Sequence, residues 1–213
     1  KWAVSANYVA SSDTGTQSNP DDGGMFTNGA KGMTLVKVEY GTPRYQLSVA
    51  YSHKDRDADA GSYYSTTWGQ HSNGSKNSIG LRGWWRPETI GLIPSVSAGF
   101  DFSNIDVDKS TVNNDNYDPE ATEETKSWMV GLNWKDVFVD GNTAGLAFGQ
   151  RQHATEKLDG SDDAANPFQW EMYYTFKVSD NISITPAIFQ ITEPASGTDD
   201  DVFGGIVTTK FKF

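Results

Sequence analysis

The chain has 213 residues, a formal net charge of −11, 36% apolar residues and no cysteine, and its mean hydropathy is −0.57. The acidic balance argues against a nucleic-acid partner, because a phosphate backbone favours clustered Lys and Arg. No stretch approaches the roughly 18 consecutive apolar residues of a membrane-spanning helix, and the lack of cysteine excludes a disulfide framework and a thiolate metal site.

Average hydropathy does not exclude a transmembrane β-barrel, because such a barrel alternates lipid-facing apolar residues with polar residues that face its interior. Aromatic residues make up 13% of the chain, which is high for so polar a protein, and the 21 glycines point to β-structure and turns. The chain opens inside a strand-like pattern, KWAVSANYVA, without an initiator Met or a signal peptide. We therefore expect it to be a processed or truncated piece of a longer protein.

Strict alternation of apolar and polar residues recurs along the whole chain, and helical periodicity is hard to find. The clearest segment places Phe168, Trp170, Met172, Tyr174 and Phe176 on one side. The pattern predicts ten strands, at residues 2–10, 34–40, 45–51, 79–85, 96–102, 128–134, 144–148, 168–178, 182–188 and 202–213.

The predicted connections alternate between long polar segments and short turns. A soluble sandwich has no reason to keep its long loops at one end, whereas an outer-membrane barrel has short periplasmic turns and long external loops. The alternation therefore predicts an all-β protein: a transmembrane, antiparallel, up-and-down barrel that occupies residues 1–213 as a single domain.

Aromatic residues lie at both ends of the predicted apolar faces, which is typical of the two interfacial girdles of a membrane barrel. The alternative is that they are core residues of a soluble β-protein, such as a lectin-like sandwich; the alternation of connections favours the barrel. The predicted girdle residues are Tyr40, Tyr45, Trp85, Trp128, Trp134, Trp170, Phe211 and Phe213.

The opposite face of each strand carries nine basic residues against three acidic ones, although the chain as a whole is acidic. Charge of one sign on one face creates a field, so we expect these residues to line a pore and bias its selectivity. The alternative is that they only hydrate the wall and pair locally. The predicted pore-lining residues are Lys37, Arg82, Asp101, Arg151, Glu171 and Lys210.

Trp84 also falls on this wet face. It either lines a sugar-binding track or packs under an infolded loop, and the pattern does not decide between the two.

No catalytic constellation is visible, and we expect no enzyme activity. The three histidines, His53, His71 and His153, fall in predicted external loops without metal-ligand spacing. The run Asp55 to Gly61 resembles the start of an EF-hand loop, but its glycine comes one position late and Thr66 stands where the bidentate Glu belongs. We expect no cofactor and no defined metal site, with weak calcium binding in the acidic loops left open.

Three blocks and the carboxy-terminal segment resemble cyanobacterial outer-membrane porins related to the carbohydrate-selective porin family. They are GWWRPETIGLIPSVSAGFDF (83–102), SWMVGLNWKDVFVDGNTAGLAFGQ (127–150), PFQWEMYYTFKVSDNISITPAIFQITEP (167–194) and VFGGIVTTKFKF (202–213). The resemblance implies a sixteen-stranded barrel, a homotrimer and a preceding surface-layer-homology domain. The ten strands would then be the carboxy-terminal part of that barrel, although ten strands could also close by themselves.

The sequence thus predicts an outer-membrane porin, a passive channel for small hydrophilic solutes and inorganic ions, in contact with membrane lipid and lipopolysaccharide. The resemblance suggests sugars or inorganic ions as solutes. The alternative is a structural or adhesive outer-membrane barrel whose acidic loops bind cations. Neither pattern nor resemblance identifies the solute or the constriction.

Overall fold

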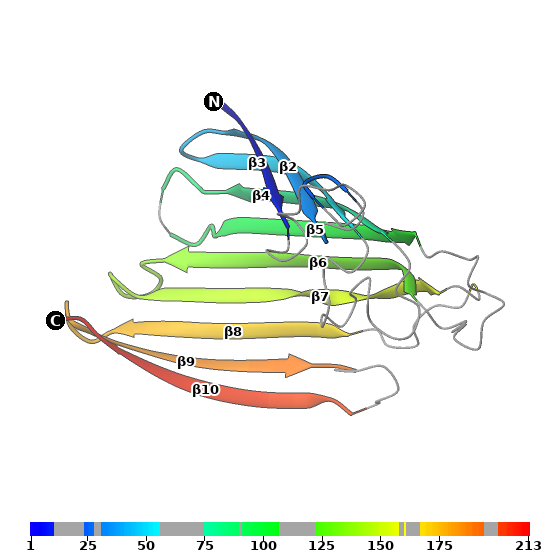
Figure 1. The fold of residues 1–213 in the computed structure, drawn as a ribbon. Helices are drawn as coiled ribbons and strands as arrows, with labels where there is room; N and C mark the ends of the chain where they lie inside the picture. Colours follow the sequence, from blue (N-terminus) through cyan, green and yellow to red (C-terminus); the bar gives the residue numbers. More distant parts are fainter. Residues whose placement is uncertain are drawn as a thin grey trace.

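The computed structural model describes residues 1–10, 24–27, 31–55, 75–89, 91–106, 122–157, 160, 167–193 and 200–213, and these ranges form one antiparallel sheet of ten strands (Figure 1). The strands are β1 (Trp2–Val9), β2 (Met33–Gly41), β3 (Tyr45–Lys54), β4 (Ser75–Trp85), β5 (Ser95–Asp106), β6 (Thr122–Lys135), β7 (Thr143–Lys157), β8 (Phe168–Lys177), β9 (Ile182–Ile191) and β10 (Val202–Phe211).

The topology is up-and-down: each strand pairs with the strands before and after it in the chain. The described strands β1 and β10 form the two edges, each hydrogen-bonded on one side only. Trp2 is paired with Tyr40 and Phe211 with Ile182, so both termini lie at the same end of the sheet. Nowhere in the described ranges is a helix long and apolar enough to cross a membrane.

The predicted alternation of connections is confirmed. The turns at residues 42–44, 86–94, 136–142 and 178–181 share one end of the sheet, called here the short-turn end. The connections at 10–32, 55–74, 107–121, 158–167 and 192–201 share the other, called here the long-connection end. The turn at 86–94 is only one residue shorter than the shortest long connections, at 158–167 and 192–201. The alternation of lengths is therefore a property of the whole series and not of any one pair of connections.

The short turns are shaped by local hydrogen bonds. The Thr42 hydroxyl accepts from the backbone N–H groups of Arg44 and Tyr45, both at 3.2 Å, beside a proline that fixes its own φ. In the 136–142 turn, Asp136 Oδ1 accepts from Gly141 N at 2.6 Å, and Gly141 adopts a φ of +87°, which glycine allows without steric cost. Short, pinned turns fix the register of the strands that they join.

Six strands extend by three or more residues beyond their predicted apolar alternation, in each case at the long-connection end: β3, β4, β5, β6, β7 and β9. β6 has 14 residues and β7 has 15. Consequently His53 lies in β3 and His153 in β7, not in loops as predicted, whereas His71 lies outside the described residues. The reason is that a ladder of backbone hydrogen bonds continues where both faces are polar, and there the alternation that marks a strand is absent.

Candidate functional site

The register joins the apolar sides of all ten strands into one surface, called here the apolar face. One rung runs through Val4, Val38, Val49, Leu81 and Phe100 on five successive strands. These side chains are substantially exposed; Val4 is 70% and Val49 is 52% accessible. The face is therefore an uncovered apolar sheet surface and not half of a packed sandwich core.

The predicted girdle residues lie on this face at two levels. Tyr45 and Tyr51, Trp128 and Trp134, and Trp170 and Phe176 are each six residues apart, which is about 20 Å along a strand. The same spacing on three strands places aromatic rings near both ends of the apolar face. Tyr40, Trp85, Phe211 and Phe213 lie at the short-turn end with Tyr45, Trp134 and Phe176.

The indole N–H groups of three of these aromatics, Trp128, Trp134 and Trp170, have hydrogen-bond partners. At the long-connection end, Trp128 Nε1 donates to Gln150 Oε1 at 2.5 Å, and Trp170 Nε1 donates to Gln190 Oε1 at 3.2 Å. At the short-turn end, Trp134 Nε1 donates to the Leu92 carbonyl oxygen at 2.9 Å. Apolar rings with a satisfied polar edge suit the boundary between hydrocarbon and water.

The opposite surface, called here the polar face, carries side-chain hydrogen bonds that link neighbouring strands. The hydroxyls of Ser78 and Ser103 are 2.8 Å apart, and those of Thr175 and Thr185 are 2.9 Å apart. Gln152 Nε2 donates to Thr125 Oγ1 at 2.8 Å. The polar face thus carries hydroxyl and amide side chains that bond across neighbouring strands.

Two of the predicted pore-lining cations are paired on this face. Lys37 Nζ is 2.7 Å from Glu39 Oε2, and Arg82 Nη2 is 2.8 Å from Asp101 Oδ2. All four side chains remain partly exposed, and Asp101 also accepts from the Ser127 hydroxyl at 3.2 Å. These pairs cancel part of the positive charge at mid-wall.

The other predicted pore-lining residues are spread over the face and are not brought together. Arg151 lies at a bulge in β7, where the register passes from the Trp128–Gln150 pair to the Lys126–His153 pair. Glu171 lies on β8 opposite Ala147 and Phe189, and Lys210 lies on β10 opposite Ser183.

Further cations of the polar face gather at the short-turn end. Arg44 pairs with Glu88 at 3.3 Å, and Lys177 pairs with Asp180 at 2.7 Å. The hydrogen bond from Lys177 holds the pKa of Asp180, which lies in the turn, below its ordinary value. Among the described residues, no ion pair involves Arg86, Lys135, Lys210 or Lys212.

Trp84 is on the polar face, as predicted, and is held in place there. Its Nε1 donates to Gln46 Oε1 at 2.8 Å, and Gln46 Nε2 donates to Glu39 Oε2 at 3.0 Å. The Arg86 guanidinium lies 4.6 Å from the centre of its ring.

Tyr173 is a polar-face aromatic that the sequence analysis did not single out. Because Met172 and Tyr174 lie on the apolar face, the alternation already implied that the Tyr173 side chain points to the polar face. The neighbouring aromatic residues made this position hard to recognise in the sequence. Asn133 Nδ2 donates to its hydroxyl at 2.8 Å.

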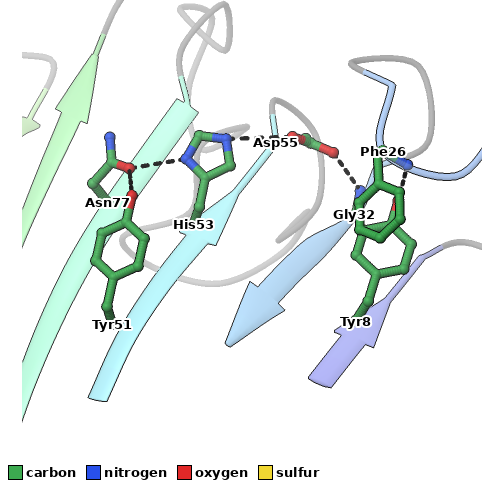
Figure 2. Close-up of polar contacts among 7 residues, drawn as sticks. All are labelled: Tyr8, Phe26, Gly32, Tyr51, His53, Asp55 and Asn77. Atoms are coloured by element: carbon green, nitrogen blue, oxygen red, sulfur yellow. Dashed lines mark hydrogen bonds and ion pairs between the residues drawn. The ribbon is translucent and has the colours of Figure 1, made fainter. Parts of the chain in front are cut away.

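At the long-connection end, a polar cluster joins β3 and β4 to the residues before β2 (Figure 2). The Tyr51 hydroxyl donates to Asn77 Oδ1 at 2.7 Å, and His53 Nδ1 lies 2.9 Å from the same oxygen. His53 Nε2 lies 3.4 Å from Asp55, whose other oxygen accepts from Gly32 N at 3.1 Å. Nearby, the Tyr8 hydroxyl accepts from Phe26 N at 2.9 Å.

This cluster marks the limit of the apolar face, because Tyr51 still belongs to the aromatic level while His53 and Asn77, next along their strands, are polar.

The described ranges contain no group of three or more His, Cys, Asp or Glu residues arranged to hold a metal. The three acidic runs considered for calcium, at 55–61, 159–163 and 199–201, extend outside the described residues at 56–61, 159, 161–163 and 199.

The chain was compared with known proteins. The model of the carbohydrate-selective porin, OprB family, matches residues 1–213. An uncharacterized protein from Nostoc sp. is 33% identical over 140 residues, which are 65% of this chain and 22% of that protein. An uncharacterized protein from Synechocystis sp. is 25% identical over 232 residues, covering 99% of this chain and 40% of that protein.

The chain therefore spans less than half of the length of these two relatives. The match to the family model extends over the whole sequence and agrees with the two-sided, all-β sheet. The chain belongs to the carbohydrate-selective porin, OprB family.

Proposed function

We propose that this chain forms part of the wall of an outer-membrane channel through which small hydrophilic solutes and inorganic ions diffuse. The observation that carries the proposal is the two-sided sheet, apolar and exposed on one face and lined with polar, hydrogen-bonding side chains on the other. In such a channel the diameter excludes large solutes, and charges on the wall bias which ions enter. Family membership supports a carbohydrate among the solutes.

The open edges of the sheet support a larger barrel. In the described chain, β1 and β10 each present unpaired backbone groups along one side. Lipid offers no hydrogen bonds, so an open edge cannot persist in a membrane. Further strands would complete the wall, sixteen in all if the family resemblance holds, and the resemblance also favours a homotrimer.

In this arrangement the short-turn end faces the periplasm and the long-connection end faces outward, as in other outer-membrane barrels. The apolar face would contact lipid, and the polar cluster around His53 and Asp55 would lie at the level of the lipopolysaccharide headgroups.

The proposal is tested with the full-length protein, folded into planar lipid bilayers and into liposomes. We expect stepwise ion conductance, and liposome swelling that slows as the test sugars increase from pentoses to disaccharides. The same protein boiled before reconstitution serves as the control for lipid leakage.

A protein that migrates as a folded, heat-modifiable species yet neither conducts nor permits swelling would contradict the channel. That outcome would favour the structural or adhesive barrel, whose acidic loops would then be examined for calcium and lipopolysaccharide binding.

A further inference from the structure

A depression of about 380 Å³ lies on the polar face near the short-turn end, over strands β4 to β8. Its volume falls within the range of about 300–1,000 Å³ that is usual for small-molecule sites. Trp84 and Tyr173 line it from strands β4 and β8, and Gly131 lies on β6, the middle one of the three strands between them.

Glycine and serine residues line the bottom of this depression, and their small side chains leave its volume open. A Cβ atom on Gly131 would lie 2.7 Å from Ser97 Oγ, and Ser97 also lines the depression. On β7, a Cβ on Gly145 would lie 2.2 Å from the Tyr173 ring, so the phenol rests directly against the backbone. The space between the two aromatic rings therefore depends on glycine beneath and beside them.

Both aromatic side chains are held before any ligand arrives. The indole of Trp84 is fixed by Gln46, and the phenol oxygen of Tyr173 accepts from Asn133. Because the Tyr173 oxygen acts as an acceptor in this bond, its O–H proton is left to donate to a ligand. Fixed aromatic rings lose little conformational entropy on binding and offer flat surfaces to the C–H faces of a sugar ring.

The charge of the depression is positive. Arg86 and Lys135 both line it, both are exposed, and neither takes part in an ion pair among the described residues. At mid-wall, by contrast, Lys37 and Arg82 have carboxylate partners on the same face. Guanidinium and ammonium groups without a counter-charge are suited to a carboxylate or a phosphate.

From these observations we infer that the depression is a subsite for a monosaccharide that carries an anionic group, either a phosphate or a carboxylate. The sugar ring lies against Trp84 and Tyr173, and the anion faces Arg86 and Lys135. A neutral sugar would use the rings alone and leave both cations without an anionic partner, since the contact of Arg86 with the Trp84 ring does not neutralise its charge. The inference rests on the proposed function, since it places the subsite on the solute pathway.

The test uses the full-length protein in planar bilayers, with glucose 6-phosphate, glucose and inorganic phosphate as probes. We expect glucose 6-phosphate to interrupt the ion current with an apparent affinity about tenfold higher than either other probe, because it alone uses both the rings and the cations. Glucuronate, compared in the same way, shows whether carboxylate and phosphate are equivalent.

Trp84→Ala and the double variant Arg86→Gln/Lys135→Gln should each remove most of this preference. The matched control is Lys210→Gln/Lys212→Gln, which removes the same charge from the same end of the sheet but outside the depression. An equal loss in the control would mean that the charge of the whole rim attracts anions, and would overturn the subsite. Equal affinity for the three probes in the unaltered protein would overturn it too.

Calorimetric titration of the detergent-solubilised protein with glucose 6-phosphate separates this inference from the channel proposal, since it needs no conductance. Binding that is lost in Trp84→Ala but kept in the control would support the subsite even in a protein that does not conduct. No binding by a protein with intact heat-modifiable migration would refute the subsite, whatever the conductance shows.

Discussion

Arg82 and Asp101 show how charge is arranged at the scale of single residues. Their side chains face each other on β4 and β5, and Asp101 lies over Gly80, where a Cβ would come within 2.8 Å of its Oδ1. The pair is partly exposed, so its contribution to folding stability is small, at about 0–1 kcal/mol. Its larger effect is on the field inside the channel, because each partner masks the other.

This arrangement predicts opposite effects of the two single neutralisations. Asp101→Asn leaves Arg82 uncompensated and should shift the reversal potential in a salt gradient toward anion selectivity. Arg82→Gln should shift it toward cations, and the double variant should return close to the unaltered protein. If both single variants shifted the reversal potential in the same direction, or if neither shifted it, this pair would not face the conducting path.

Lys37 and Glu39 form the matched pair on β2. Glu39→Gln should therefore reproduce the direction of the Asp101→Asn shift, which separates an effect of wall charge from a local distortion at Asp101.

At the scale of strands, β6 and β7 show where the membrane-spanning part ends. Trp128 is the last apolar-face aromatic on β6 before Lys126, whose ammonium lies 3.8 Å from Glu124. The Trp128 ring contacts the rings of Phe148 and Phe168, whose centres are 6.2 and 6.3 Å from its own. Beyond it both strands continue with polar residues on both faces, so this level is the upper edge of the apolar band.

Trp128→Phe keeps a ring at this edge and removes the N–H donor to Gln150. We expect the free energy of unfolding, measured by urea titration in detergent, to fall by about 1 kcal/mol, the usual net contribution of one hydrogen bond. Trp2→Phe is the matched control, because none of the hydrogen bonds among the described residues uses the Trp2 indole. Similar losses in both variants would mean that the loss of the larger indole ring, and not of the hydrogen bond, lowers the free energy of unfolding.

At the scale of the whole molecule, the central claim is that the two faces of the sheet meet different solvents. The chain has no cysteine, so single cysteines report on one position at a time. In the reconstituted full-length protein, Ser48→Cys should react with a charged, membrane-impermeant thiol reagent, and Val49→Cys, its neighbour on β3, should not. Equal labelling of both would contradict the membrane-spanning wall.

Several features followed from the sequence because they repeat along it. The side-chain period of a strand is two, so alternation alone assigned each of Val36, Val38 and Tyr40 to the apolar face, and Trp84 to the polar one. The turns were readable because proline, glycine and polar residues interrupt that period. The strand ends that contain His53 and His153 could not be read from the sequence, because a strand segment with polar residues on both faces shows no apolar–polar alternation.

The amino-acid sequence by itself determined the strand order, the two-sided character of the sheet and the ends at which its long and short connections lie. All three are local, carried by residues next to each other in the chain. Only the tertiary structure decided which side chains meet across strands: Arg82 with Asp101, Trp84 with Gln46, and Tyr173 with Asn133. Such meetings depend on register and side-chain conformation over strands far apart in sequence, and a single alternating pattern is compatible with many of them.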